Sequence, residues 1–259
     1  MVTSTQFLAS LAVLSSAVSA SIYAPYNVRN QGVPAGQLKN VSGIEMYISY
    51  PPNANTSTRA LLYVSDIFGV PLLQNKLLAD SLAANDYLVV MPDLFAGDAI
   101  SVEEQEAGLN LTDWRALHPS SEIDRIINTT LAALKADFGV EKVGGLGYCF
   151  GGKYVPRFLK NGGLDLGFIA HPSNLQEAEI GGIENPISIA AGTLDNSFNA
   201  TAKFRAEEIL KINNVTFQSN LYYGAPHGFA VRVNQSVPLQ AYAKQASFVQ
   251  AVTWFDAWL

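Results

Sequence analysis

The sequence has 259 residues, of which 49% are hydrophobic, and its formal net charge is −6. This length and composition are typical of one globular domain with a substantial core. The 16 lysine and arginine residues are scattered along the chain. Because a nucleic-acid backbone is bound by a concentrated basic surface, we expect no nucleic-acid partner.

The first 20 residues have the features of a signal peptide. Residues 7–14 form an apolar run that only Ser10 interrupts, and residues 18–20 (Val-Ser-Ala) suit signal peptidase, although no lysine or arginine precedes the run. The run is shorter than the roughly 20 apolar residues that span a bilayer, so we expect no membrane span. We therefore predict cleavage before Ser21, secretion to the extracellular space and a single mature domain over residues 21–259.

Seven Asn-x-Ser/Thr sequences support secretion, because they are acceptors for N-glycans. The acceptor residues are Asn40, Asn55, Asn110, Asn128, Asn199, Asn214 and Asn234. The chain has one cysteine, Cys149, and so cannot form an intrachain disulfide. A lone thiol in an oxidising compartment is a liability unless it is buried or used, which draws attention to Cys149.

Apolar strands alternate with helices after the leader. We expect strands over residues 44–49, 60–64, 87–91, 143–148, 166–170, 187–191 and 216–222. We expect helices over residues 73–84, 123–138, 200–211 and 239–259, and one more that begins near residue 150. This order predicts an α/β fold with a mostly parallel central sheet and helices on both faces. Ligands of such sheets bind beyond the carboxyl ends of the strands.

Residues 96–121 interrupt the alternation. The segment is polar, has no strong period, and contains an acidic cluster at residues 103–106. We expect it to form a lid or an excursion from the fold, with the acidic cluster on a solvated face. His118 in this segment is a candidate for contact with a substrate.

The strongest local motif is Gly-Tyr-Cys-Phe-Gly-Gly at residues 147–152, between a predicted strand and a predicted helix. This is the pattern of a nucleophile elbow, with the sulfur of Cys149 in place of a serine oxygen. Small flanking residues are needed there because the nucleophile sits on a tight, strained turn. The alternative is a buried structural cysteine in a glycine-containing turn.

Two more residues follow predicted strands in the order nucleophile, acid, histidine that this motif requires. Asp195 ends the run that begins at residue 187, and His227 follows the strand predicted over residues 216–222. Imidazole transfers protons near neutral pH, and a carboxylate can orient it. Taken singly, Asp195 could be a turn or helix-capping residue, and His227 a solvated loop residue.

The other histidines do not fit this order. His171 follows a strand but precedes Asp195, and we interpret it as pocket lining or as a hydrogen-bonding residue of the core. Three dispersed histidines and one cysteine lack the spacing of metal ligands, so we expect no metal site.

Five ordered motifs together resemble the dienelactone hydrolase family of the α/β-hydrolase superfamily, notably its fungal branch. They are residues 66–69 (Asp-Ile-Phe-Gly), 92–95 (Pro-Asp-Leu-Phe), 147–155 (Gly-Tyr-Cys-Phe-Gly-Gly-Lys-Tyr-Val), 192–195 (Gly-Thr-Leu-Asp) and 227–229 (His-Gly-Phe). The similarity extends over residues 44–259. It implies an α/β-hydrolase fold.

The resemblance also implies roles for individual residues. Cys149 would attack a carbonyl carbon, His227 would act as base and then as acid, and Asp195 would orient the imidazole. The backbone N–H groups of Ile67 and Phe150 would form the oxyanion hole.

Two departures from bacterial members concern thiol activation and substrate. Asp66 stands where those proteins have a glutamate that influences thiol activation, and it is one methylene shorter. Gly97 stands where they have an arginine for the substrate carboxylate. Dienelactone itself is therefore in doubt as the substrate.

We thus expect a secreted cysteine-dependent hydrolase that cleaves a small-molecule ester or lactone through an acyl-thioenzyme, with no metal or organic cofactor. One alternative is a broad carboxylesterase without a dedicated lactone substrate. The other is a catalytically silent member of the fold that binds a small ligand or a protein. The presence of all three of Cys149, Asp195 and His227 argues against a silent protein.

Overall fold

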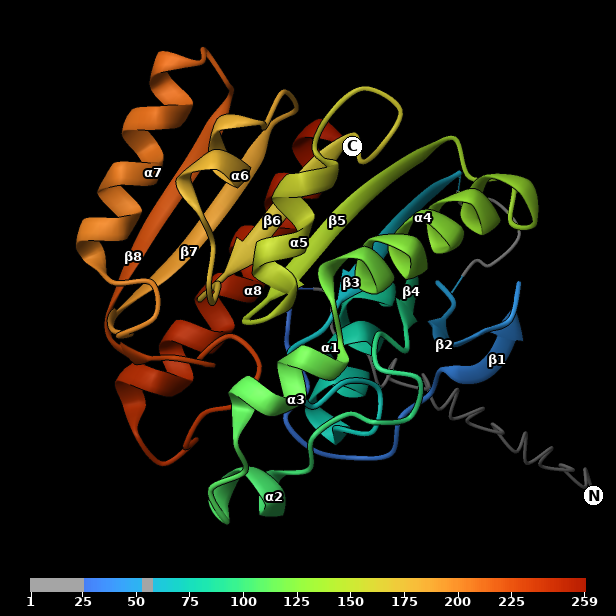
Figure 1. Ribbon diagram of the computed structural model, residues 1–259, viewed down its shortest axis with the longest axis horizontal. Coiled ribbons are helices and arrows are strands. Elements are labelled where there is room, and N and C mark those ends of the chain that lie inside the picture. Colours follow the sequence, from blue (N-terminus) through green and yellow to red (C-terminus); the bar gives the residue numbers. More distant parts are fainter. Residues whose placement is uncertain (1–25, 53–57) are drawn as a thin grey trace, which may run out of the picture.

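The structure is a computed structural model that describes residues 26–52 and 58–259. The predicted signal peptide and Asn55 lie outside the described residues. The centre of the fold is an eight-stranded sheet with strand order β1-β2-β4-β3-β5-β6-β7-β8 (Figure 1). The strands are β1 (Gln37–Val41), β2 (Ile44–Ser49), β3 (Arg59–Val64), β4 (Leu88–Pro92), β5 (Lys142–Tyr148), β6 (Leu166–Ala170), β7 (Ile187–Leu194) and β8 (Phe217–Pro226).

Helices connect most of the strands. They are α1 (Leu73–Ala83), α2 (Val102–Glu106), α3 (Leu111–Leu117), α4 (Ser120–Ala136), α5 (Gly151–Phe158), α6 (Glu177–Gly181), α7 (Ala200–Ile212) and α8 (Pro238–Trp258). Within the described part of the chain, no helix combines the length and the hydropathy needed to cross a membrane.

The sheet is mostly parallel, as predicted, because only β2 runs antiparallel to its neighbours β1 and β4. In the parallel part, Val64 is paired with Gly147, Tyr148 with Ala170, and Ala170 with Ala190. The carboxyl ends of β3, β5, β6 and β7 therefore meet at one edge of the sheet. Residues that follow these strands are brought close together there.

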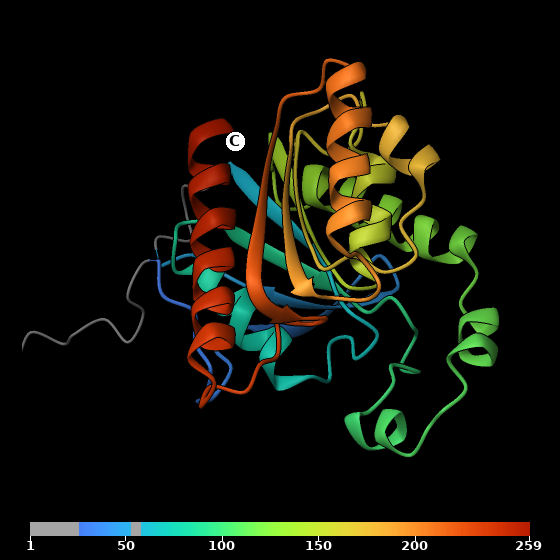
Figure 2. The ribbon, with the colours of Figure 1, turned by 90° about the vertical axis from the view of Figure 1, so that its left-hand side faces the viewer.

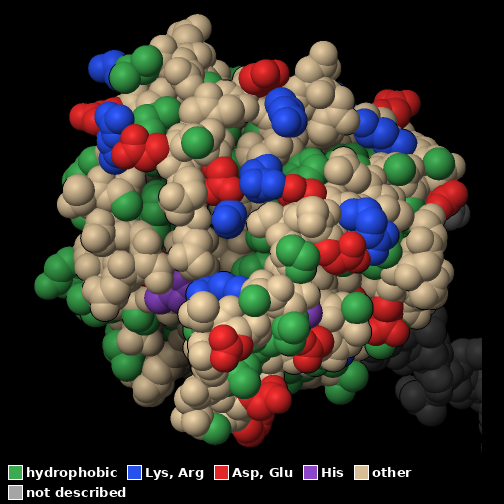
Figure 3. All heavy atoms as spheres, in the orientation of Figure 1, with side chains coloured by type: hydrophobic (Ala, Val, Ile, Leu, Met, Phe, Trp, Pro, Cys, Tyr) green, Lys and Arg blue, Asp and Glu red, His purple; other side chains and the backbone are tan. Residues whose placement is uncertain are grey.

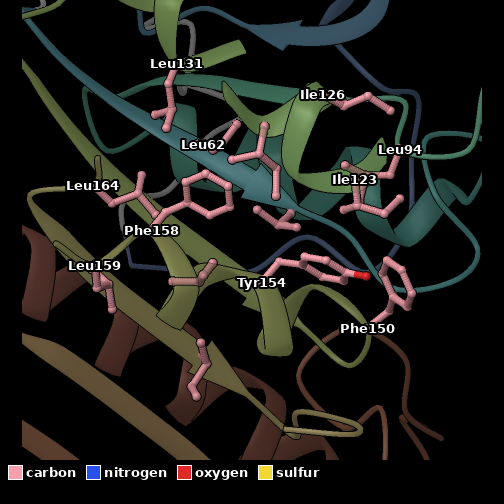
Figure 4. Packing of buried hydrophobic residues seen from close by; sticks show 14 of the residues in the cluster. Leu62, Leu94, Ile123, Ile126, Leu131, Phe150, Tyr154, Phe158, Leu159 and Leu164 are labelled. Atoms are coloured by element: carbon pink, nitrogen blue, oxygen red, sulfur yellow. The ribbon is translucent and has the colours of Figure 1, made fainter. Parts of the chain in front are cut away.

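Helices cover both faces of the sheet, as expected from the alternating pattern (Figure 2). Side chains of α1 and α8 pack into the core on one face. Side chains of α4, α5 and α7 pack into the core on the other face. Figure 4 shows part of this second core, where Ile123 and Ile126 of α4 lie near Phe150 and Tyr154 at the start of α5.

The structure differs from the predicted elements mainly at the sheet edges. β1 is absent from the predicted strands, because its side chains are largely exposed and have no apolar alternation. β8 continues to Pro226, past the predicted end at residue 222, because Leu194 is paired with Pro226 after an irregularity in the register. The other predicted strands and long helices are present, with ends shifted by a few residues.

The excursion over residues 96–121 contains two short helices, α2 and α3, whose few turns explain the weak sequence period. Trp114 of α3 is buried, and its ring centroid lies 4.9 Å from that of Phe95 and 6.1 Å from that of Phe150. The acidic cluster at residues 103–106 is exposed, as expected. The segment therefore packs beside the predicted nucleophile, and its acidic face is in solvent.

Candidate active site

Cys149 lies in the turn between β5 and α5. Its φ of +50° is in the left-handed region, which few residues other than glycine adopt. Backbone hydrogen bonds hold the turn: the N–H of Cys149 donates to the carbonyl of Ala170 at 3.2 Å, and its carbonyl accepts from Gly152 at 3.1 Å and from Ser173 at 2.9 Å. The thiol residue is free and partly exposed. This is the geometry of a nucleophile elbow rather than of a cysteine sealed in the core.

The glycines of the motif are required by close backbone approaches. A Cβ atom on Gly147 would lie 2.5 Å from the carbonyl oxygen of Gly151, and one on Gly151 would lie 1.9 Å from that of Val64. The N–H of Gly151 donates to the carbonyl of Ser65 at 3.0 Å. The turn that carries Cys149 is thus packed directly against the end of β3.

His227 joins the other two predicted residues. Its Nε2 atom lies 3.0 Å from the sulfur of Cys149, and its Nδ1 atom lies 3.0 and 3.1 Å from the two carboxylate oxygens of Asp195. Asp195 is only 1% exposed and also accepts from the N–H groups of Ser197 and Phe198, at 2.8 and 3.2 Å. Asp195 thus shapes its own turn and contacts the imidazole. The three side chains form one continuous chain of contacts.

The electrostatic interactions among Cys149, His227 and Asp195 favour a charged imidazole on His227. Burial opposes the charge on His227, but hydrogen bonds to Asp195 and Cys149 and the negative charges of these partners raise its pKa to about 10. Burial likewise opposes the charge on Asp195, but the hydrogen bond and the positive charge of His227 lower its pKa. A charged imidazole therefore lies directly beside the sulfur of Cys149.

Two different segments carry the predicted oxyanion-hole residues. Ile67 follows β3 and Phe150 follows Cys149, and they are 4% and 7% exposed. Within the described part of the chain, neither of their backbone N–H groups donates a hydrogen bond. The ring of Phe150 packs against that of Tyr154, with centroids 4.9 Å apart (Figure 4). Two N–H groups are therefore available to an acceptor near Cys149.

Asp66 is hydrogen-bonded to its own loop and to α1, and its carboxylate also interacts with the charge of His227. One of its oxygens accepts from the N–H of Phe68 at 3.1 Å and from the side chain of Asn75 at 2.9 Å. The other lies 3.9 Å from Nε of Arg232. Burial raises the pKa of Asp66, although the hydrogen bond from Asn75 and the charge of Arg232 act in the opposite direction. Within the described chain, Asp66 and Cys149 are not hydrogen-bonded to each other.

His171 lies behind the imidazole of His227. The two ring centroids are 5.2 Å apart with an interplanar angle of 72°. His171 is fully buried, and neither ring nitrogen has a hydrogen-bond partner within the described chain. Burial and the nearby charge of His227 hold its pKa well below the usual range. Of the two roles predicted for His171, lining the site fits these contacts and hydrogen bonding in the core does not.

His118 contacts other residues of the excursion and its aromatic neighbours, and it has no hydrogen bond to Cys149, His227 or Asp195 in the described chain. Its Nε2 atom lies 2.9 Å from a carboxylate oxygen of Asp98. Its ring centroid is 4.5 Å from that of Trp114 and 5.3 Å from that of Phe95. His118 therefore helps to fix α3 against the aromatic residues beside the elbow.

Three residues near the site were missed by sequence reasoning. The hydroxyl oxygen of Ser173 is 3.7 Å from the sulfur of Cys149, and its place just beyond β6 was a usable signal. Asn75 interrupts the apolar face of α1, and a polar residue there also signals a buried contact. Nothing in the sequence distinguishes Arg232, because its approach to Asp66 depends on the path of the loop after β8.

The glycan acceptors within the described residues are all exposed: Asn40, Asn110, Asn128, Asn199, Asn214 and Asn234. The side-chain oxygens of Asn110 and Asn199 cap α3 and α7 by accepting from the N–H groups of Thr112 and Ala202. Glycans are attached to the amide nitrogen, so these caps are compatible with glycosylation.

Two observations on the described residues concern charged surfaces and metal ligands. Basic and acidic side chains are interspersed on the face shown in Figure 3. Over residues 26–52 and 58–259 there is no group of three or more His, Cys, Asp or Glu residues arranged to hold a metal ion.

Curated relatives share most of the length of the chain. It is 42% identical over 230 residues to the hydrolase pyvD of Aspergillus violaceofuscus, which covers 89% of this chain and 93% of that protein. It is 31% identical over 237 residues to Dienlactone hydrolase 1 of Gibberella moniliformis, which covers 89% and 90% of the two chains.

Solved structures agree with the fold. The chain superposes on the dienelactone hydrolase of Anabaena variabilis with a TM-score of 0.61 and 17% sequence identity, over 86% of this chain and 99% of that chain. The model of the dienelactone hydrolase family matches residues 44–259. The chain is therefore a hydrolase of ester or lactone bonds with the α/β-hydrolase fold, and it belongs to the dienelactone hydrolase family.

Proposed function

We propose that the protein is a secreted hydrolase of small esters or lactones that uses Cys149 as its nucleophile and forms an acyl-thioenzyme. The observation that carries the proposal is the unbroken chain of contacts from Asp195 through His227 to Cys149. The separation of 3.0 Å between Nε2 of His227 and the sulfur is within the range for proton exchange.

In the proposed reaction, the thiolate of Cys149 attacks the carbonyl carbon of the substrate, and the carbonyl π electrons move to the oxygen. The N–H groups of Ile67 and Phe150 stabilise the resulting oxyanion. The carbon–oxygen bond then breaks, and His227 donates its Nε2 proton to the leaving oxygen. With a lactone, the new hydroxyl remains on the acyl group.

Water completes the cycle. His227, now neutral, removes a proton from a water molecule that attacks the thioester carbonyl. The second tetrahedral intermediate collapses by breaking the carbon–sulfur bond, which releases the acid and regenerates the thiolate beside the imidazolium. Asp195 stays charged throughout and holds the imidazole ring in orientation.

The residue at position 97 bears on the substrate class. Gly97 stands where bacterial members of the family have a carboxylate-binding arginine; it is exposed, and its N–H donates to Asp93 at 2.7 Å. Because glycine has no side chain, this position cannot bind a carboxylate through two parallel hydrogen bonds, as an arginine would. This favours uncharged esters and lactones over dienelactone and keeps the broad carboxylesterase as the second candidate. Comparison of kcat/KM for p-nitrophenyl esters, simple lactones and dienelactone would distinguish the two.

We further propose that residues 21–259 form the mature, glycosylated, single-domain enzyme. The apolar leader, the small residues before Ser21 and the number of acceptor sequences support this proposal. The exposure of the six acceptors in the described chain is consistent with attached glycans. A fully buried acceptor would have argued against it.

Replacing the nucleophile tests the proposed reaction. We expect Cys149→Ala to lower kcat for a p-nitrophenyl ester by at least about 10³-fold, because the reaction loses its covalent step. Circular dichroism should show that the variant is folded. Equal activity in the variant and the wild type would mean that Cys149 is not the nucleophile, and two inert folded proteins would favour the silent member of the fold.

The charge of Asp195 is tested by the pH dependence. The pKa of His227 is raised to about 10, so the imidazolium is present at neutral pH and is lost as the pH rises through this value. We expect kcat/KM of the wild type to fall only near that pH. Asp195→Asn removes a charge that raises the pKa, so the fall should begin at lower pH, and kcat should drop by about 10²-fold or more. An alkaline limb at the same pH in both proteins would contradict this assignment.

Secretion is tested on the protein from its native source. We expect its N-terminal residue to be Ser21 and its apparent mass to decrease after treatment with an N-glycosidase. An intracellular protein that retains residues 1–20 and does not shift in mass would refute the proposal.

A further inference from the structure

The loop that follows β3 carries one of the two proposed oxyanion donors. Residues 65–69 form neither helix nor strand. Within the loop, the N–H of Gly69 donates to the backbone carbonyl of Asp66 at 3.1 Å, and the N–H of Phe68 donates to its carboxylate at 3.1 Å. These bonds fold the loop around Ile67, but they do not attach it to the rest of the protein.

Backbone N–H groups of Gly151 and Ile100 donate to the carbonyls of Ser65 and Ile67, both at 3.0 Å, and Asn75 of α1 adds a side-chain attachment. Its amide nitrogen donates to the carboxylate of Asp66 at 2.9 Å and to the carbonyl of Gly69 at 2.9 Å. Its amide oxygen accepts from the hydroxyl of Tyr63 in β3 at 2.9 Å. Asn75 is fully buried, and these bonds use both of its N–H donors. One side chain therefore connects both ends of the loop to a helix and to a strand of the sheet.

We propose that Asn75 is a positioning residue for the oxyanion hole, and that Asp66 acts through it to hold the loop of Ile67 rather than to activate the thiol. The inference rests on the proposed function. The contacts of Asp66 support it, because one carboxylate oxygen is taken by Phe68 and Asn75 and the other faces Arg232.

Small displacements of this loop matter for the reaction. An oxyanion donor must lie about 2.7–3.1 Å from the developing charge, and misplacement of a reacting group by about 1 Å can cost 10²-fold in rate. Ile67 lies between Asp66 and Phe68, both of which are held by the network. Loss of the network would leave the loop held only by the backbone bonds from Gly151 to Ser65 and from Ile100 to Ile67, so we expect the N–H of Ile67 to shift while Cys149 keeps its contacts.

Two variants separate positioning of the loop from activation of the thiol. Asn75→Leu has a similar size and removes all three hydrogen bonds, and Tyr63→Phe removes only the hydroxyl that holds Asn75. We expect kcat for a p-nitrophenyl ester to fall about tenfold or more in Asn75→Leu and less in Tyr63→Phe, with KM changed by less than about threefold.

The second measurement is the rate at which iodoacetamide alkylates Cys149. Alkylation needs the thiolate but forms no oxyanion, so it reports activation of the thiol alone. We expect this rate to remain within about twofold of the wild type in both variants, because Asn75 acts on the oxyanion and not on the sulfur.

Asn185→Leu is a matched control. In the wild type, Asn185 lies just before β7, at the end of the sheet opposite to Cys149, and its amide nitrogen donates to the carbonyl of Leu164 at 2.7 Å. The variant loses a comparable amide-to-carbonyl bond, and we expect kcat of the folded protein to be unchanged.

The inference is overturned if ester turnover and alkylation fall in parallel, because Asn75 and Asp66 would then act on the thiol. It is also overturned if the folded Asn75→Leu variant keeps the kcat of the wild type. Should Asn75→Leu fail to fold, Tyr63→Phe decides by the same criteria. Full activity of Cys149→Ala, in contrast, would reject the proposed function itself.

Discussion

Contact between the turn at Cys149 and the end of β3 is the constraint on which the rest of the site depends. Because a Cβ atom on Gly151 would meet the carbonyl oxygen of Val64 at 1.9 Å, no larger residue fits there. This contact places the left-handed turn of Cys149 beside the loop of Ile67, and the hydrogen bond from Gly151 to Ser65 joins the two. The proposed nucleophile and the proposed oxyanion donors are thus held by one backbone arrangement, which costs little reorganisation during a reaction.

The side chains of Asp195 and His227 complete the site from the ends of β7 and β8. Parallel pairing places Asp195 after β7 and His227 after β8, at the same edge of the sheet as Cys149 after β5. The buried carboxylate and the sulfur keep the imidazole charged at neutral pH, and the neutral ring of His171 packs against it without competing for the proton. The resting site therefore holds the imidazolium that the proposed reaction requires.

Much of this was predictable because it depends on chain order. Cys149, Asp195 and His227 each follow a strand, and parallel strands end at one edge, so a pattern of strand ends was enough to bring them together. The exposed edge strand β1 was not predictable from apolar periodicity. Nor were the contacts of Asp66, since they depend on how α1 places Asn75 and how the loop after β8 places Arg232. Such contacts arise from packing between distant segments, for which a single sequence carries little signal.

The central claim is that catalysis proceeds through an acyl group on the sulfur of Cys149, and mass spectrometry tests it directly. The mature enzyme would be mixed with a p-nitrophenyl ester, quenched in acid within the first turnovers, and its intact mass and peptides measured. We expect an increase equal to the acyl group, located on the peptide that contains Cys149 and absent in Cys149→Ala. Turnover by the wild type with the acyl group on another residue, or with no adduct under conditions where deacylation is slow, would contradict the account.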